Sequence, residues 1–286
     1  MEIANSIQTL REVRKRWRDE QCTVGFVPTM GNLHNGHLSL LQKARELTDK
    51  TACSIFVNPL QFDQAKDLER YPKTMDDDIA RLQEHGADLL FVPNTEMIYP
   101  YGAEKRTTIN VPGIADLLEG RHRKGHFTGV ATVVCKLFNL VEPDIAVFGE
   151  KDFQQLTLIR QMVEDLNFPI EIVGSPTIRS PEGLALSSRN GNLTEKERVQ
   201  ASEIYRCLKD CIASLRDGIR DFEKLESLAV ERLSAAGFSP EYFTVRNVAD
   251  LLPARKTDNA DVLIVLTAAR LGDVRLIDNM QVAESS

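Results

Sequence analysis

The chain has 286 residues, of which 42% are hydrophobic and 27% are charged, as expected of a globular protein with one or two domains. Its formal net charge of −7 disfavours a nucleic-acid partner, because a polyanion gains little from a negatively charged surface. No apolar run has transmembrane length and the first residues show no signal-peptide pattern, so we expect no membrane partner and a cytoplasmic location.

The first half of the chain alternates strand-like and helix-like segments. The predicted strands cover residues 22–27, 51–57, 88–92, 144–148 and 170–173. The predicted helices cover residues 6–20, 36–48, 72–85, 128–141 and 152–166. This alternation predicts an α/β fold, a doubly wound Rossmann-like parallel sheet, whose ligands bind beyond the carboxyl ends of the strands.

The pattern changes after Gly174. Residues 176–191 are rich in Pro, Ser, Gly and Arg and predict a loop or hinge. Two helices, at 194–217 and 221–236, precede two strands, at 241–248 and 261–277, the second with a turn at 271–273. We therefore predict a Rossmann-like ligand-binding domain at residues 1–175 and a smaller α+β lid domain at 176–286.

The five cysteines form no CxxC pair. We expect reduced, buried thiols in preference to disulfides or a zinc site.

The segment with the sequence PTMGNLHNGH follows the first predicted strand and opens a helix. A helix N-terminus presents unpaired N–H groups and a positive dipole end, which favour a phosphate. Gly31 and Gly36 allow close approach of a nucleotide, and the imidazoles of His34 and His37 can donate hydrogen bonds to phosphate oxygens. The alternative, in which one histidine caps the helix and the other is exposed, is less favoured for two histidines in an HxGH pattern. A dehydrogenase-type fold is disfavoured because GxGxxG is absent.

Two further motifs follow predicted strands. Asn58 and Gln61 supply amides, which suit a hydroxyl or a carboxylate, although a polar turn would also explain them. In FGEKDFQQ, Gly149 permits close approach, Lys151 offers a charge for phosphate, and Gln155 could face the same cleft. Asp152 suits a helix N-cap by default, and a solvated surface lysine is the alternative for Lys151.

Basic and hydroxyl side chains gather in two loops. Thr177 and Arg179, with Ser187, Ser188 and Arg189, could form a mobile anion clamp, with a helix-capping loop as the alternative. The basic segment 119–127 could close over an anionic substrate or could equally be a solvated loop.

Together the motifs PTMGNLHNGH, FVNPLQF, YPKTMDDD, GHFTGV, FGEKDFQQL and SSRN resemble the pantoate–β-alanine ligase (pantothenate synthetase) family of the HxGH nucleotidyltransferase superfamily. They occur in the family's order between Pro28 and Asn190, whereas the chain from Val199 onward matches only in length and general pattern. Leu186 replaces a methionine that the family commonly has, which is a swap of similar volume.

The resemblance implies a two-step reaction. The carboxylate of pantoate attacks the α-phosphorus of ATP, which gives pantoyl adenylate and pyrophosphate. The amine of β-alanine then attacks the acyl carbon, which gives pantothenate and AMP. The resemblance also implies ATP as a substrate used with Mg²⁺, no tightly bound organic cofactor, and a homodimer.

The resemblance assigns roles residue by residue. The catalytic residues would be His37, His34 and Lys151. The ATP site would comprise Met30, Gly31, Asn32, Leu33, His34, Asn35, Gly36, His37, Gly149, Glu150, Lys151, Asp152, Ile178, Leu186, Ser187, Ser188 and Arg189. The substrates would contact Gln61, Gln155, Asn58, Arg123 and His126. Asp77 and Asp78 fall where the family has acidic residues that could meet Mg²⁺, but a surface helix N-terminus explains them equally well.

Two other functions remain open at this point. Another nucleotidyltransferase of the superfamily would leave the nucleotide on its product, and a nucleotide sensor would bind ATP without releasing pyrophosphate. The amides of Gln61 and Gln155 argue against a sensor, which needs no acid site. An aminoacyl-tRNA synthetase fits less well, because no basic RNA-binding appendage is visible.

Overall fold

The computed structural model describes residues 1–62, 68–69, 71–102 and 106–283. The chain forms two compact units. The first comprises Met1–Glu150 and Gln154–Ser175, and the second comprises Lys151–Phe153 and Pro176–Ser286. Among the described residues, no helix is long and apolar enough to cross a membrane.

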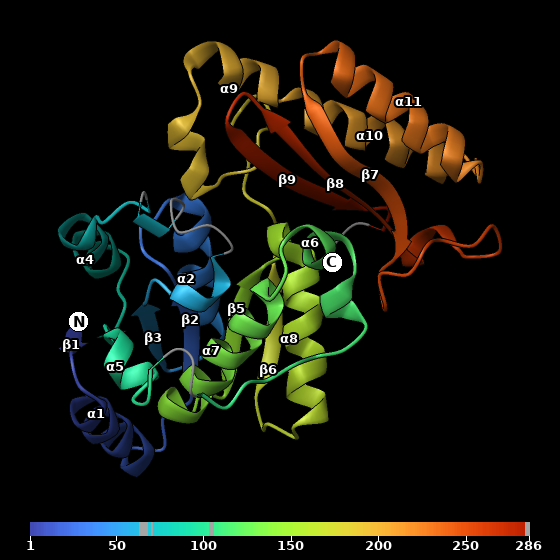
Figure 1. The fold of residues 1–286 in the computed structure, drawn as a ribbon. Helices are drawn as coiled ribbons and strands as arrows, with labels where there is room; N and C mark the ends of the chain where they lie inside the picture. Colours follow the sequence, from blue (N-terminus) through green and yellow to red (C-terminus); the bar gives the residue numbers. More distant parts are fainter. Residues whose placement is uncertain (63–67, 70, 103–105, 284–286) are drawn as a thin grey trace. The chain divides into compact units, whose positions relative to one another are not determined.

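The first unit contains a six-stranded parallel sheet with the strand order β1-β4-β3-β2-β5-β6 (Figure 1). Its strands are β1 (Glu2–Ala4), β2 (Val24–Thr29), β3 (Lys50–Ile55), β4 (Leu89–Phe91), β5 (Ile145–Gly149) and β6 (Glu171–Ser175). The predicted α/β class and parallel sheet are thus confirmed. The edge strand β1 was not predicted, because three residues are too short to show an alternating pattern.

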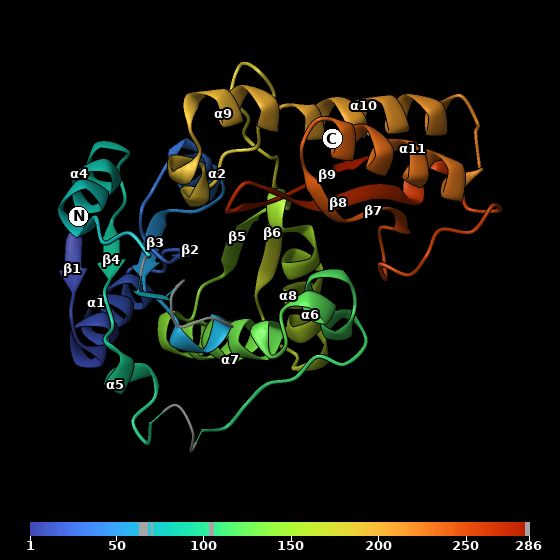
Figure 2. The same ribbon diagram turned by 45° about the horizontal axis from the view of Figure 1, so that its top comes forward.

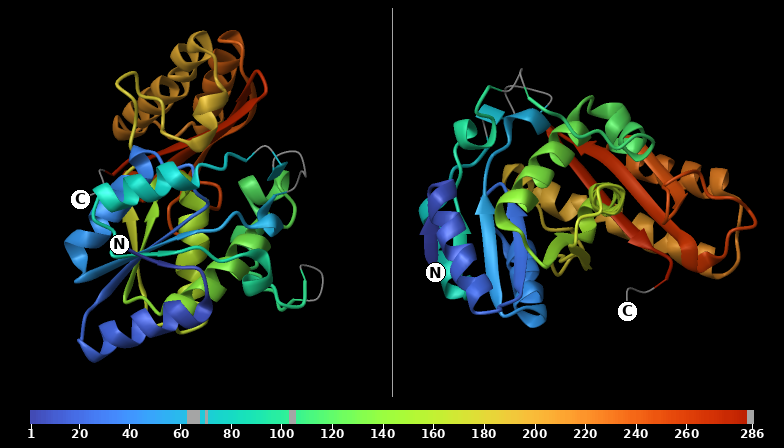
Figure 3. Two further views of the ribbon diagram at one scale, coloured as in Figure 1. Left: turned by 90° about the vertical axis from the view of Figure 1, so that its left-hand side faces the viewer. Right: turned by 90° about the horizontal axis from the view of Figure 1, so that it is seen from below.

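Helices cover both faces of this sheet (Figure 3). They are α1 (Ile7–Asp19), α2 (Asn35–Leu47), α4 (Met75–Glu84), α5 (Thr95–Ile98), α6 (Leu118–His122), α7 (His126–Val141) and α8 (Phe153–Asp165). Neighbouring residues of β2 point to opposite faces. A Cβ at Gly25 would lie 3.0 Å from Ala44 of α2, whereas the ring of Phe26 packs edge-on against Phe138 of α7. Helices α2 and α7 therefore lie on opposite sides of the central strand.

Helix α4 begins at Met75, three residues after the predicted start at Pro72. Thr74 precedes it with φ −123° and ψ 38°, outside the helical region, and accepts the first helical hydrogen bond from the N–H of Asp78. The proline's fixed φ suits the start of a helix but does not force one.

The second unit is an antiparallel sheet with helices on one face (Figure 2). Its strands are β7 (Ser239–Asn247), β8 (Leu263–Leu271) and β9 (Val274–Gln281), and its helices are α9 (Glu195–Ala201), α10 (Glu203–Arg216) and α11 (Phe222–Ala235). The turn predicted at 271–273 joins β8 to β9. The helix predicted over 194–217 is divided at Ser202, whose buried hydroxyl donates to the carbonyl of Val199 at 2.7 Å and so interrupts the helical ladder.

All five cysteines are free thiols. Cys53, Cys207 and Cys211 are buried, whereas Cys22 and Cys135 are half-buried. Burial raises the pKa of Cys53 and of Cys211 to about 12, and that of Cys207 to about 11, so these three thiols stay protonated and inert at neutral pH.

Candidate active site

Three of the predicted motifs follow three adjacent strands. Strand β2 lies between β3 and β5 in the sheet, and all three run parallel. Residues 30–37 follow β2, Asn58 and Gln61 follow β3, and β5 ends at Gly149. Parallel strands present their carboxyl ends along one edge, so the fold brings these motifs to the same end of the sheet (Figure 1).

The turn after β2 has two consecutive residues with positive φ, Gly31 at 81° and Asn32 at 51°. A side chain at position 31 would be strained in this conformation, and its Cβ would also lie 3.0 Å from the carboxylate of Asp78. The turn directs successive N–H groups to one point, as in other anion-binding nests.

Asp78 is the anion that fills this nest. Its carboxylate accepts hydrogen bonds from the N–H of Asn32 at 2.9 Å and of Leu33 at 2.7 Å, and from the hydroxyl of Thr74 at 3.0 Å. Asp78 lies in the first turn of α4 but is only 2% exposed, so the expectation that it lies at the surface is wrong, whereas Asp77 is exposed. Both carboxylate oxygens of Asp78 are engaged in holding the turn, which favours an anchoring role over a metal-binding one.

His34 and His37 cap helix α2 together. Nδ1 of His34 accepts from the N–H of Gly36 at 3.1 Å, and Nδ1 of His37 accepts from the N–H of His34 at 3.3 Å. The ring centroids are 4.1 Å apart and both residues are half-buried. Because Nδ1 accepts in both neutral rings, the proton lies on Nε2 in both. Both histidines take part in the cap and both are half-buried, so the alternative in which one caps the helix and the other is exposed does not describe this helix start.

Asn58 is 1% exposed, so its side chain has no surface left for a substrate, contrary to its expected role. Its Oδ1 accepts from the N–H of Leu60 at 3.3 Å and from the hydroxyl of Tyr99 at 2.9 Å. Its Nδ2 donates to Oε1 of Gln61 and to the carbonyl of Gly129, both at 3.1 Å. All four hydrogen-bonding positions of this carboxamide are used within the protein.

Gln61 is held at its backbone as well as at its side chain. Its carbonyl accepts from Nδ1 of His126 at 2.8 Å and from Nη2 of Arg123 at 3.2 Å. Nη1 of Arg123 lies 3.1 Å from Nε2 of His126 and can only donate to it, which leaves the proton of His126 on Nδ1. The side-chain Nε2 of Gln61 donates to Sδ of Met30 at 3.1 Å, which links this residue to the turn after β2. Arg123 and His126 thus lie beside Gln61 and fix its backbone carbonyl.

Gly149 at the end of β5 has open space beside it. A Cβ built there would meet only Cδ2 of Leu40, at 3.9 Å, which is ordinary contact. The fold's own packing therefore does not require a glycine at this position, in contrast to Gly129, where a Cβ would lie 2.5 Å from the carbonyl oxygen of Leu60.

The two glutamines of FGEKDFQQ differ in their surroundings. Gln154, which the sequence did not single out, is 3% exposed. Its Oε1 accepts from the N–H of Glu119 at 3.0 Å, and its Nε2 donates to the carbonyls of Ile114 and Leu117. Gln155, the predicted substrate residue, is half-buried. Adjacent residues on a helix point about 100° apart, so the two glutamines meet different surroundings.

Arg179 in the second unit is an anchor, which corrects its interpretation as part of a mobile clamp. It makes two hydrogen bonds to the carboxylate of Asp278, at 2.5 and 2.9 Å, and stacks 4.3 Å from the ring of Tyr205. Asn279, which follows Asp278 on β9, donates from Nδ2 to the carbonyl of Lys151 at 2.8 Å. The guanidinium is thus committed to the protein, and β9 holds the backbone of Lys151.

The remaining expected ATP residues of the second unit lie on a small hairpin and the turn that follows it. The N–H of Leu186 donates to the carbonyl of Ile178 at 2.9 Å, which brings these two residues together. The hydroxyl of Ser187 caps the turn η4 (Ser188–Asn192) by accepting from the N–H of Arg189 at 3.3 Å. The expected ATP residues up to Glu150 belong to the first unit. The second unit contains the others, which are Lys151, Asp152, Ile178 and residues 186–189.

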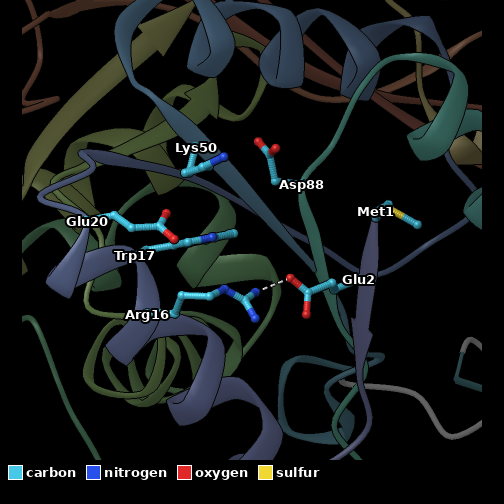
Figure 4. Close-up of a pocket in the computed structure, with 7 residues that line it drawn as sticks. All are labelled: Met1, Glu2, Arg16, Trp17, Glu20, Lys50 and Asp88. Carbon is cyan, nitrogen blue, oxygen red and sulfur yellow. Dashed lines mark hydrogen bonds and ion pairs between the residues drawn. The ribbon is translucent and has the colours of Figure 1, made fainter.

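A polar hollow of about 410 Å³ lies at the amino ends of the strands (Figure 4). Arg16 and Glu2 form an ion pair there, beside the buried edge of Trp17. It is lined by Met1, Glu2, Arg16, Trp17, Glu20, Lys50 and Asp88. None of these belongs to the predicted motifs, and ligands of such sheets bind at the opposite, carboxyl ends. We therefore assign it no part in the site.

A family model described as pantoate-beta-alanine ligase matches residues 2–281 of the chain. A pantothenate synthetase from Pseudomonas putida strain GB-1 is 52% identical over 279 residues, which cover 96% of each chain. Another, from Idiomarina loihiensis, is 49% identical over 280 residues, which cover 98% of each chain.

Solved structures of two similar proteins superpose on nearly the full length of this chain. The pantothenate synthetase of Thermus thermophilus is 42% identical, with a TM-score of 0.91 over 99% of this chain and 100% of that one. The pantoate-beta-alanine ligase of Francisella tularensis is 37% identical, with a TM-score of 0.83 over 99% of this chain and 98% of that one. The latter was solved in complex with beta-gamma ATP and beta-alanine.

Proposed function

The chain belongs to the pantoate–β-alanine ligase family, and from this premise we propose that it joins pantoate to β-alanine through a pantoyl-adenylate intermediate, with release of pyrophosphate and AMP from ATP. The observation that carries the adenylate is the reciprocal cap of His34 and His37, in which both Nδ1 atoms accept from backbone N–H groups at a helix N-terminus and the proton of each ring is left on Nε2. Such an arrangement suits the negative charge that develops at a phosphate under attack.

In the first step, the carboxylate oxygen of pantoate attacks the α-phosphorus of ATP, and the bond from that phosphorus to the bridging oxygen breaks as pyrophosphate leaves. No general base is needed, because a carboxylate is already ionised at neutral pH. His34 and His37 donate hydrogen bonds to the phosphate, and Lys151 balances the charge of the phosphates. Gln61 and Gln155 hold pantoate, and Gly149 leaves room for the nucleotide.

In the second step, the amine of β-alanine attacks the acyl carbon of the adenylate. The bond between that carbon and the phosphate oxygen breaks, AMP leaves, and the nitrogen loses a proton. A lid must keep water from the adenylate, and we assign this role to the lid domain predicted at residues 176–286.

The residues present do not fit a magnesium ion held by the protein itself. The described parts of the chain contain no group of three or more His, Cys, Asp or Glu side chains that could hold a metal ion, and the carboxylate of Asp78 is engaged by backbone N–H groups. An ion of this kind is commonly bound mainly through substrate phosphates and water. We derive no step through it. The homodimer is likewise a proposal, which rests on the family resemblance, and the cytoplasmic location remains the expectation drawn from the sequence.

The adenylate is tested by isotope exchange between ATP and labelled pyrophosphate. We expect exchange when pantoate is present and β-alanine is absent, because reversal of the first step re-forms ATP. Omission of pantoate is the control and should abolish exchange. Formation of ADP in the complete reaction, or exchange without pantoate, would contradict the proposal.

A further inference from the structure

Tyr99 is a buried residue whose hydroxyl contacts the side chain of Asn58. It is 3% exposed and is the residue that caps the short helix α5 at its carboxyl end. Its ring packs 6.3 Å from that of Phe56, and its hydroxyl lies 2.9 Å from Oδ1 of Asn58. No sequence motif pointed to this residue, since its role depends on a contact across 41 positions of the chain.

The backbone fixes the orientation of the Asn58 carboxamide. The N–H of Leu60 can only donate, so the atom that faces it must be Oδ1, and the carbonyl of Gly129 can only accept, so the atom that faces it must be Nδ2. The hydroxyl of Tyr99, which lies against Oδ1, therefore donates. Burial raises the pKa of this phenol above its ordinary value, so the donor keeps its proton at any pH at which the enzyme would be assayed.

The orientation of the Asn58 carboxamide in turn fixes that of the Gln61 carboxamide. Because Nδ2 of Asn58 donates, the atom of Gln61 that faces it must be Oε1, and the Nε2 group then points toward Met30 in the turn after β2. We propose that Tyr99 is a positioning residue that acts through Asn58 to hold the carboxamide of Gln61 with its N–H donors toward the acid substrate. This inference rests on the proposed function, in which Gln61 holds pantoate.

The test is Tyr99→Phe, which keeps the ring against Phe56 and removes only the hydroxyl. We expect the KM for pantoate to rise about three- to tenfold, the effect of one neutral hydrogen bond, while the KM for ATP stays unchanged. Tyr101→Phe is the matched control, because Tyr101 is 82% exposed and lies two positions along the chain, and it should change neither constant. Equal KM values for pantoate in Tyr99→Phe and the unaltered enzyme would overturn the inference.

A coupled measurement separates positioning from general stability. Gln61→Ala should itself raise the KM for pantoate, and Tyr99→Phe should add nothing in that background, because its effect passes through Gln61. A further rise in the double variant, or parallel increases in the KM for ATP and pantoate with a lower Tm, would show that Tyr99 acts only on folding and would overturn the inference. An unchanged KM for pantoate in Gln61→Ala would instead contradict the proposed function of Gln61.

Discussion

Open space beside a residue can be as informative as its contacts, and Gly149 is the example in this chain. A methyl group there would touch only Leu40, at 3.9 Å, so Gly149→Ala should fold with a stability within about 0.5 kcal/mol of the unaltered protein. We expect the KM for ATP to rise about tenfold or more, because the methyl group would occupy the space of the nucleotide. Thermal unfolding and steady-state kinetics measure the two effects.

Gly120→Ala is the contrasting variant for that experiment. Its Cβ would lie 1.8 Å from the carbonyl oxygen of Ala115, so it should lower the Tm strongly. A Gly149→Ala enzyme with the normal KM for ATP would show that no nucleotide approaches this glycine.

Asp77 and Asp78 provide a matched pair at the same helix N-terminus. Asp78→Asn replaces an acceptor by a donor that faces backbone N–H groups, so we expect a loss of about 2–3 kcal/mol in the free energy of unfolding. Asp77→Asn changes an exposed residue and should stay within about 0.5 kcal/mol. Urea denaturation measures both. Similar losses in the two variants would contradict the anchoring role of Asp78.

At the scale of elements, hydrophobic periodicity was sufficient to predict the long strands and helices of the first unit. Helix α7 was expected at 128–141 and spans His126–Val141, and the strand expected at 144–148 spans Ile145–Gly149. The three-residue strand β1 carries no period, because its place depends on pairing with β4, far along the chain. The division of the predicted helix at Ser202 depends on one local hydroxyl, which periodicity does not detect.

The candidate site likewise has features that the sequence could predict and features that it could not. The positions of the HxGH, Gln61 and Gly149 motifs followed from the strand-end rule. The functions of Asn58, Asp78 and Arg179 within the structure could not be predicted, because each is fixed by a partner far along the chain, beyond any local pattern: Gly129 for Asn58, Asn32 and Leu33 for Asp78, and Asp278 for Arg179.

The close contact between α7 and the turn η1 (Pro59–Gln61) allows a prediction about the position of the whole turn. Gly129→Ala should favour the helix intrinsically by about 1 kcal/mol, but its Cβ would lie 2.5 Å from the oxygen of Leu60 and 3.0 Å from the nitrogen of Gln61. We expect the turn to shift, so that the KM for pantoate rises while the KM for ATP does not. Steady-state kinetics with each substrate varied in turn will measure this, and a normal KM for pantoate would contradict it.

For the whole molecule, the buried thiols set an alkaline limit to stability. Burial raises the pKa of Cys53 and Cys211 to about 12 and of Cys207 to about 11, against 9.0 in the unfolded chain. Above about pH 9 the unfolded state binds fewer protons than the folded state, so the free energy of unfolding falls as pH rises from about 9 toward 12. The Tm should therefore decrease steadily over this range.

Cys211→Ala tests this assignment without requiring the variant to be as stable as the unaltered protein. Its Tm should start lower, because a buried side chain is shortened, but should decline less steeply above about pH 9. Identical slopes in Cys211→Ala and the unaltered protein would show that other groups control the alkaline unfolding.

The reciprocal cap of His34 and His37 is completed when helix α2 forms, before any ligand arrives. In water, donors must turn toward a phosphate as its charge grows, and this reorganisation forms part of the activation barrier. The backbone N–H groups of Gly36 and His34 fix both imidazoles through their Nδ1 atoms as soon as the helix forms. Under the proposed function, the cost of orienting these rings is therefore met during folding and not during the reaction.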